Sequence, residues 1–272
     1  MKAQDLFKVK GLVTVVTGGA SGIGYAYAQV MADNDAVVTI LDRDVEAIPN
    51  AVMKLKSGMA EAFGEVADVT DKASLARAFD AVVKRHGRID VVFANAGISG
   101  GPGFLNTQNE REPSRAVENL PDDLWDRVIA TNLSSVFKTI QVAVPHLKKN
   151  GGGKIIVTSS CSATKIEQYV GTIYVTSKAG VAHLIRQTAI ELARYNISVN
   201  AIAPGPCITN IGGGRLQDKS AQDFFSKLHP NHRMATPEDM QGAALYLASP
   251  ASRHVTGAEI LIDGGFTLGT VD

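Results

Sequence analysis

The segment Thr17-Gly18-Gly19-Ala20-Ser21-Gly22-Ile23-Gly24 decides the fold of this 272-residue chain. It joins an apolar, β-branched run at 13–16 to a helix-like stretch at 23–33. Glycines in such a turn permit unusual dihedrals and let the backbone approach a diphosphate, which the free N–H groups of the next helix bind. The spacing Gly18-x-x-x-Gly22-x-Gly24 departs from G-x-G-x-x-G, so the turn taken by itself also fits a plain tight connection.

Short apolar runs alternate with longer helix-like stretches along the rest of the chain. The sequence predicts strands at 13–16, 37–41, 62–67, 89–94, 154–158, 198–203 and 259–262. It predicts helices at 23–33, 45–56, 72–85, 122–149, 173–195 and 237–248. Strands that are apolar throughout are expected when helices cover both faces of a parallel sheet. We therefore expect one doubly wound, Rossmann-type α/β domain over residues 1–272, with about seven parallel strands.

The totals exclude several classes of protein. With 27 basic and 27 acidic residues the net charge is zero, so a nucleic-acid partner is not expected. The apolar runs are too short to span a bilayer, and no long apolar core follows the first lysine, so neither a membrane nor a signal peptide is expected. The two cysteines, Cys161 and Cys207, resemble no disulfide framework, and the six histidines show no paired metal spacing. We expect a cytoplasmic protein without a metal.

Polar residues follow the predicted strands at the edge where such sheets bind ligands. Asp42 ends the second strand, about 20 residues beyond the glycines, where a carboxylate accepts hydrogen bonds from an adenosine ribose. It would repel a 2′-phosphate, which favours NAD over NADP, although Arg43 could accommodate that phosphate. Asp42 also fits a simple turn. Asp68-Val69 and Asn95-Ala96-Gly97 follow the next two strands and are candidate contacts for the adenine and ribose.

The segment Tyr174-Val175-Thr176-Ser177-Lys178 indicates acid–base chemistry. Positions i and i+4 lie on one face of a helix, so a phenol and an ammonium are presented together. A nearby cation favours the phenolate and lowers the tyrosine pKa, which makes the side chain a usable general acid or base. Upstream, the strand 154–158 runs into Ser159-Ser160-Cys161-Ser162, where a hydroxyl could bind a substrate oxygen. The G-x-S-x-G motif of many hydrolases is absent.

Taken in order and at matching spacing, these motifs resemble those of the classical short-chain dehydrogenase/reductase family over nearly the whole chain. The motifs that carry the resemblance are Thr17–Gly24, Asn95-Ala96-Gly97, Thr131-Asn132-Leu133, Ser159-Ser160, Tyr174-x-x-x-Lys178, Asn200–Pro206, Pro237-Glu238-Asp239, Thr256-Gly257 and Asp263-Gly264-Gly265. The resemblance implies an NAD(H)-dependent oxidoreductase that transfers a hydride between a nicotinamide and a secondary alcohol or ketone. A catalytically silent binding or regulatory protein of this fold, and an NAD-dependent lyase or epimerase, are the alternatives.

The resemblance also implies a role for each catalytic residue. Tyr174 would be the acid/base, and Lys178 would lower its pKa and hold the nicotinamide ribose. Ser160 would orient the substrate oxygen, while Asn132 would kink its helix and hold a water linked to Lys178. The spacing usual in the family places the catalytic serine at Cys161 when it is counted back from Tyr174, and at Ser160 when it is counted forward from Asn132. We prefer Ser160.

The remaining residues implied by the family concern the cofactor and the assembly. The expected cofactor contacts are Gly18, Ser21, Gly22, Ile23, Gly24, Asp42, Arg43, Asp68, Val69, Asn95, Ala96, Gly97, Tyr174, Lys178, Pro204, Gly205, Ile208 and Thr209. A homotetramer or dimer is expected, because family members pair their tyrosine-bearing helices. Four small residues, Ala179, Gly180, Ala182 and Ala189, would allow close helix packing there.

Two segments are candidates for substrate selection. The polar stretch 98–120 is longer than is usual in the family; it is either a solvated loop or a rim over the site, where an arginine meets a polar substrate group. Residues 209–235 are expected to form a substrate flap, in which Gly212–Gly214 give hinge freedom. The expected pocket residues are Cys161, Ser162, Ile166, Tyr169 and Ile211, together with Ile208. Tyr169 is expected either to line the pocket or to pack against it. This mostly apolar set favours a cyclic, aromatic or branched substrate, and Trp125 is expected in the core.

Overall fold

A single parallel sheet forms the centre of the protein. The computed structural model describes residues 2–56 and 60–270, and its seven strands lie in the order β3-β2-β1-β4-β5-β6-β7. Their bounds are β1 Val13–Thr17, β2 Val37–Asp42, β3 Ala62–Val66, β4 Val91–Ala94, β5 Gly153–Thr158, β6 Ile197–Pro204 and β7 Glu259–Ile262. The chain builds outward from β1 to β3 and then crosses back to β4, so the switch point lies between β1 and β4. The predicted doubly wound sheet is confirmed.

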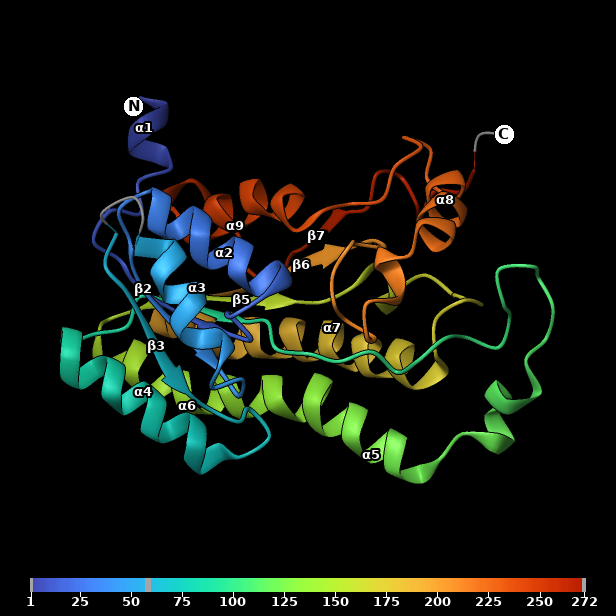
Figure 1. Cartoon of the computed structure of the whole chain (residues 1–272). Coiled ribbons are helices and arrows are strands. Elements are labelled where there is room, and N and C mark those ends of the chain that lie inside the picture. Colours follow the sequence, from blue (N-terminus) through green and yellow to red (C-terminus); the bar gives the residue numbers. More distant parts are fainter. Residues whose placement is uncertain (1, 57–59, 271–272) are drawn as a thin grey trace.

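Helices cover both faces of the sheet (Figure 1). One layer contains α2 Gly22–Asp33, α3 Ala47–Leu55 and α9 Gln241–Ala248, and the other contains α4 Lys72–His86, α6 Ser135–Lys149 and α7 Thr172–Leu192. Successive residues of β1 divide between the layers: Val15 belongs to the core cluster under α4, α6 and α7, and Val16 to the cluster under α2 and α9. Because neighbouring side chains of a strand point to opposite faces, a strand covered on both sides has to be apolar throughout.

The predicted helix 122–149 is one run with a defect in the middle. It starts as α5 Asp122–Ile129, passes through a π-helical turn at Ala130–Ser134 and continues as α6. Single π turns inside helices often mark functional positions. Trp125 lies on α5 with 44% of its surface exposed, so its predicted place in the core is wrong.

Shorter elements complete the fold. A small α1 Ala3–Leu6 precedes β1, and α8 Lys219–Lys227 lies inside the predicted flap, where the sequence analysis expected no helix. The predicted helix 237–248 begins as a 3₁₀ turn, Pro237–Met240, before α9. Within the described ranges, every helix is too short or too polar to cross a membrane.

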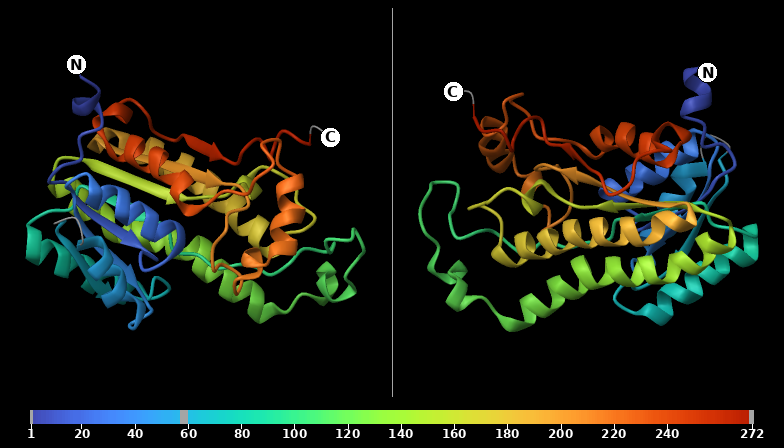
Figure 2. Two further views of the ribbon diagram at one scale, coloured as in Figure 1. Left: turned by 45° about the horizontal axis from the view of Figure 1, so that its top comes forward. Right: turned by 180° about the vertical axis from the view of Figure 1, so that it is seen from behind.

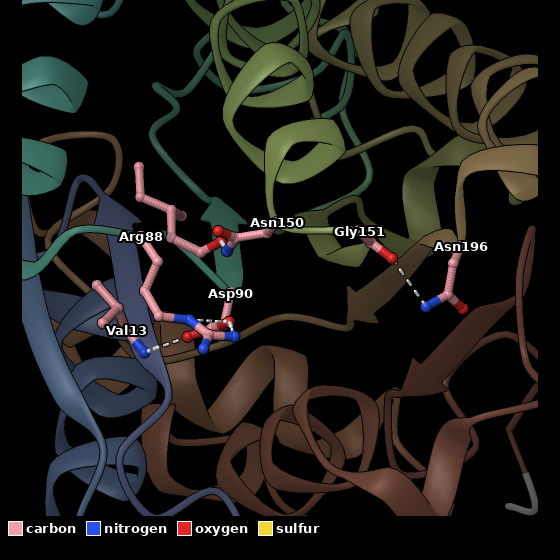
Figure 3. A network of polar contacts seen from close by, with 7 residues as sticks. Val13, Arg88, Asp90, Asn150, Gly151 and Asn196 are labelled. Carbon is pink, nitrogen blue, oxygen red and sulfur yellow. Dashed lines mark hydrogen bonds and ion pairs between the residues drawn. The ribbon is translucent and has the colours of Figure 1, made fainter.

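At the amino ends of the strands, polar groups around the buried carboxylate of Asp90 pair with one another (Figure 3). The carboxylate of Asp90, which is 7% exposed, accepts the Val13 N–H at 2.9 Å and the Arg88 Nε–H at 2.9 Å. Nearby, the Asn150 side chain donates to the Ile89 carbonyl, and Asn196 Nδ2 donates to the Gly151 carbonyl at 3.3 Å. These bonds tie the start of β1 and β4 to the loops before β5 and β6.

The opposite, carboxyl edge of the sheet faces the two segments singled out for substrate selection. Loop 98–120 and α8 both extend to the end of the molecule away from the N-terminus (Figures 1 and 2). The loop carries two short 3₁₀ turns, Pro113–Arg115 and Val117–Asn119, and bridges back to the segment before α7 through Pro102 and Val170. The fold thus gathers long connections over one edge of the sheet only.

Candidate active site

A cavity of about 540 Å³ opens at the carboxyl edge of the sheet. Its floor is made by residues that end β1, β2, β4, β5 and β6, and its walls by most residues of the segments 96–101 and 204–216. Ligands bind at this edge in open α/β sheets, beside the switch point. The cavity is therefore the candidate active site.

The glycine turn forms the narrow end of the cavity. Gly18 has φ +63°, a left-handed conformation that favours glycine. A Cβ built on Gly24 would lie 2.1 Å from the Gly18 carbonyl oxygen, so the helix start packs directly on the turn. The first amides of α2 have no acceptor inside the helix and point out of its N-terminus, which suits an anionic group. The residues present therefore fit the diphosphate of a dinucleotide.

Asp42 lines the cavity at the end of β2. Its Oδ2 accepts the Ala20 N–H at 3.1 Å, and its Oδ1 accepts the Asp44 N–H at 3.1 Å. The carboxylate thus braces the glycine turn and its own turn at once, as the interpretation of Asp42 as a turn residue expects, while the contact with a ribose stays a prediction. Arg43 lines the same end, so a group that favours a 2′-hydroxyl and one that suits a 2′-phosphate lie side by side.

Two further loops complete this end of the cavity. Asp68 accepts hydrogen bonds from the Thr70 hydroxyl at 2.7 Å and the Thr70 N–H at 2.8 Å, and these bonds hold its pKa below the usual value. Asn95 fixes three strand ends: Nδ2 donates to the Thr17 carbonyl at 3.1 Å, and Oδ1 accepts from the Thr158 hydroxyl at 2.9 Å. The asparagine keeps the floor rigid.

Tyr174 and Lys178 lie together on α7 and both line the cavity, as predicted. Lys178 is 4% exposed, its Nζ donates to the Thr158 carbonyl at 2.7 Å, and the same atom lies 5.7 Å from the centre of the Tyr174 ring. Burial lowers the pKa of Lys178 to about 8. The ammonium is thus held one turn from the phenol by the end of β5.

The pKa of Tyr174 moves in the opposite direction to our expectation. Burial raises it above its ordinary value, and the charges near Cys161 and Glu167 add to the effect, while a hydrogen bond with Ser160 opposes it. The net direction for the pKa of Tyr174 is therefore opposite to the lowering expected from Lys178. The physical reason is that loss of water around the phenolate costs more than an ammonium engaged with the Thr158 carbonyl returns.

Asn132 is fully buried in the π-helical turn, behind the cavity wall. Its Oδ1 accepts the Ile98 N–H at 2.8 Å, and its Nδ2 donates to the Ile98 carbonyl at 2.9 Å and the Ser177 hydroxyl at 3.3 Å. The predicted kink in the helix is present. The side chain joins the start of loop 98–120 to the turn of α7 between Tyr174 and Lys178.

Ser160 begins a chain of hydrogen bonds that the sequence did not reveal. Its hydroxyl donates to Ser162 Oγ at 3.1 Å, and the Ser162 hydroxyl donates to Oε1 of Glu167. The Ser162 N–H returns a bond to Ser160 Oγ at 3.1 Å. Glu167 was missed because a glutamate in a polar loop looks solvated; the only signal was its short distance in sequence from the serines.

Most of the predicted cofactor contacts are brought together on the cavity wall. Those that line it are Gly18, Ser21, Gly22, Ile23, Asp42, Arg43, Asp68, Val69, Asn95, Ala96, Gly97, Tyr174, Lys178, Pro204, Gly205 and Thr209. Gly24 lies behind the turn and does not line the cavity. Ile208 does not line it either; its N–H donates to the Ala235 carbonyl at 2.9 Å.

The predicted substrate pocket is only half right. Cys161, Ser162 and Ile211 line the cavity, but Ile166 is 90% exposed and points into solvent. Tyr169 does not line the cavity; its ring packs edge-on against Phe224 at 5.0 Å, behind the wall. Ile166 is therefore a correction, whereas Tyr169 packs against the pocket wall, which is the second of the two placements expected for it. They were placed by counting along a loop, which has no fixed periodicity.

Comparison with known proteins identifies the family. A family model described as enoyl-(acyl carrier protein) reductase matches residues 18–267. The D-threitol dehydrogenase of Mycolicibacterium smegmatis is 34% identical over 98% of this chain and 99% of its own length. The chain belongs to the classical short-chain dehydrogenase/reductase family. It is a dehydrogenase or reductase that acts on an alcohol or carbonyl group, as the named relatives of this family do.

Two solved structures show how similar the family fold is. The NADPH-dependent 3-quinuclidinone reductase of Rhodotorula rubra superposes with a TM-score of 0.85 at 33% identity, covering 98% of this chain and 95% of its own. A 7α-hydroxysteroid dehydrogenase, in complex with NADH and 7-oxo glycochenodeoxycholic acid, has a TM-score of 0.85 at 29% identity, covering 100% and 99%. Relatives of this short-chain dehydrogenase/reductase thus use either nicotinamide cofactor.

Proposed function

We propose that the protein is an NAD(H)-dependent oxidoreductase that interconverts a secondary alcohol and its ketone. The observation that carries the proposal is the convergence of Tyr174, Lys178 and Ser160 at one wall of a cavity whose other end is a glycine turn and Asp42. When bound, the nicotinamide accepts or donates the hydride. All other parts of the chemistry fall to side chains of this chain.

Tyr174 is the proposed acid/base. In alcohol oxidation its oxygen takes the hydroxyl proton of the substrate, and in ketone reduction it returns that proton. Its raised pKa in the protein alone keeps the phenol protonated, which suits the donor role. For the reverse direction a positive charge has to approach the phenolate, and a bound oxidised nicotinamide would supply one.

Lys178, Ser160 and Asn132 position the reacting groups. Lys178, held by the Thr158 carbonyl, provides a fixed cation near the phenol and a donor for the nicotinamide ribose. Ser160 holds the substrate oxygen next to Tyr174. Asn132 fixes the backbone of Ile98 and the side-chain hydroxyl of Ser177, so that the opposite walls of the cavity keep their distance.

NAD rather than NADP is the proposed cofactor. Asp42 presents a carboxylate whose two oxygens are already oriented by the Ala20 and Asp44 amides. A 2′-phosphate there would meet a like charge, whereas a 2′-hydroxyl would donate to it. Arg43 favours NADP, because a guanidinium can bind the 2′-phosphate. The cofactor preference of Asp42 and Arg43 variants measures which residue dominates.

We further propose a homotetramer or dimer located in the cytoplasm. Two exposed apolar side chains, Ile190 on α7 and Phe137 on α6, with 76% and 47% of their surface exposed, could pack against a second copy. The small residues named from the sequence contribute less: Ala182 and Ala189 are buried within the chain. Light scattering of the purified protein and of Ile190→Glu tests this, since a smaller mass for the variant supports pairing through α7.

The test of the reaction is spectrophotometric. Purified protein is mixed with NAD or NADP and a panel of acyclic, cyclic and aromatic secondary alcohols, and absorbance of the reduced nicotinamide is followed. We expect turnover with NAD for at least one substrate, and a loss of about 10²- to 10⁴-fold in Tyr174→Phe, in line with removal of an acid/base group. NADH binding, measured by fluorescence, should persist in the variant. Near-normal turnover of Tyr174→Phe would refute the assignment.

A further inference from the structure

A buried carboxylate, Glu167, lies on the substrate side of the cavity, and no step above uses it. It is 8% exposed and lines the cavity in the segment between β5 and α7. Its Oε1 accepts a hydrogen bond from the Ser162 hydroxyl and a weak one from Cys161 Sγ at 3.6 Å. Within residues 2–56 and 60–270, its Oε2 accepts none.

No nearby cation pairs with this carboxylate in the described structure. Burial raises the pKa of Glu167, the bonds from Ser162 and Cys161 oppose this, and the charge of Lys165 opposes it least. Lys165 is engaged elsewhere: its Nζ donates to the Phe266 carbonyl and lies 3.6 Å from the centre of the Phe266 ring. In the described structure Oε2 lacks a protein donor but is not closed off from solvent, so a new donor can reach it. Glu167 lines the cavity, and a ligand bound there can supply that donor.

A short chain of hydrogen bonds connects Glu167 to Ser160, the residue proposed to hold the reacting oxygen. Ser160 hydrogen-bonds to Ser162 at 3.1 Å, and Ser162 in turn donates to Glu167. Glu167 is therefore two hydrogen bonds from the group proposed to hold the reacting oxygen. In a vicinal diol or an α-hydroxy ketone, the second oxygen sits on the adjacent carbon, so the substrate can contact both ends of this short chain.

We propose that Oε2 of Glu167 accepts a hydrogen bond from a hydroxyl on the carbon next to the reacting carbon, so that vicinal diols and α-hydroxy ketones are the preferred substrates. This rests on the proposed function and narrows its substrate class. The hydride goes to the nicotinamide and the hydroxyl proton to Tyr174, while Glu167 is unchanged by the reaction. An adjacent carboxylate on the substrate would meet a like charge and be disfavoured. The sequence favours a mostly apolar substrate body, and this proposal adds a hydroxyl next to the reacting carbon.

A matched pair of substrates tests the proposal. The values of kcat/KM with NAD are measured for 2,3-butanediol and for 2-butanol, which lacks only the neighbouring hydroxyl. We expect the wild-type protein to favour the diol by about 10- to 100-fold, the range for a hydrogen bond to a charged group. In Glu167→Gln the ratio should fall by about tenfold, and in Glu167→Ala it should approach one.

Two control variants separate substrate binding from positioning of Ser160. Ser162→Ala cuts the link between Glu167 and Ser160 but keeps the carboxylate, so it should slow both substrates and preserve their ratio. Glu118→Gln changes an exposed glutamate of loop 98–120 and should leave the ratio unchanged. If Ser162→Ala lowers the ratio as much as Glu167→Gln does, Glu167 acts only through Ser160 and the proposal is overturned.

Equilibrium binding makes the test independent of turnover. Each alcohol is titrated into the protein–NADH complex and the nicotinamide fluorescence is followed, which also reports whether each variant is folded. A diol preference in binding that is lost in Glu167→Gln supports the proposal even if no alcohol is oxidised, a result that would refute only the proposed function. Equal binding of both alcohols to the wild-type protein overturns the proposed role of Glu167. A preference for 1-amino-2-propanol over the diol, lost in Glu167→Gln, overturns the hydroxyl assignment in favour of a cation.

Discussion

The two edges of the sheet carry similar polar side chains but use them differently. At the amino edge, the carboxylate of Asp90 is met by the Val13 N–H and by Arg88 (Figure 3). At the carboxyl edge, Lys178 is held by one carbonyl and Glu167 keeps one oxygen without a protein donor in the described structure. Buried polar groups that pair with each other stabilise a fold, whereas those that face a cavity are available to a ligand. The edges should therefore respond to mutation in opposite ways.

The largest expected effect is on activity at the carboxyl edge. Lys178→Met should lower kcat/KM by about 10²- to 10⁴-fold, the range for loss of acid–base assistance. The free energy of unfolding should change by less than about 1 kcal/mol, because the substitution removes a charge whose burial is itself unfavourable. Urea unfolding and steady-state kinetics on the same preparation measure both. A variant that is both active and unstable would show that Lys178 serves the fold.

The next effect is on stability at the amino edge. Asp90→Ala leaves the buried Val13 N–H without its acceptor and should lower the free energy of unfolding by about 2–3 kcal/mol. The value of kcat should stay within about twofold, because the site lies at the other end of the strands. Denaturant melts measure the free energy of unfolding, and the absorbance of NADH measures kcat. Asp90→Asn, which keeps an acceptor oxygen, is the matched control and should lose less. An unchanged midpoint for Asp90→Ala would contradict the comparison.

A smaller effect is expected for Asp42, which both stabilises the fold and faces the cavity. Asp42 holds the Ala20 and Asp44 amides and also lines the cavity. Asp42→Asn keeps an acceptor oxygen but loses the charge, so stability should hold while the preference for NAD over NADP falls by about tenfold, or about 1.4 kcal/mol. Ratios of kcat/KM for the two cofactors measure it. Arg43→Ala is the matched control and should raise the preference for NAD. Should Asp42→Asn leave the ratio unaltered, Arg43 rather than Asp42 decides the cofactor.

The smallest effect is expected for a surface ion pair near the amino edge. Lys10 Nζ and Asp35 Oδ2 lie 3.1 Å apart, but both side chains are about two-thirds exposed, at 68% and 67%. Lys10→Ala should change the free energy of unfolding by less than about 0.5 kcal/mol. Thermal melts at low and high salt measure it. If Lys10→Ala lowered the free energy of unfolding as much as Asp90→Ala, solvent exposure would not explain the difference between the Lys10–Asp35 and Arg88–Asp90 ion pairs.

The nucleotide end of the site could be read from the sequence because its signals are local. The glycine spacing, the position of Asp42 after a strand and the four-residue spacing of Tyr174 and Lys178 each follow from one element's geometry. The π-helical turn could not be read, because the run 122–149 is helical in pattern on both sides of Asn132. The turn forms where the Asn132 side chain reaches Ile98, a residue 34 positions away.

The substrate end was predicted less well because loops have no period to count. Ile166 is exposed and Tyr169 packs behind the wall, while Glu167, which lies between them, lines the cavity. Nothing in the order of these three residues indicates which one turns inward. Their directions are set by the serines of the β5 end and by Phe224 of α8, which are brought close only when the chain has folded.

The sequence by itself determined the parallel sheet, the dinucleotide-type turn and the pairing of a tyrosine with a lysine, because apolar periodicity and short spacings act within one strand, turn or helix. Only the tertiary structure decided the pKa of Tyr174, the link from Asn132 to Ile98 and the burial of Glu167. These depend on which groups exclude water from each other, and that is set by contacts between segments far apart along the chain.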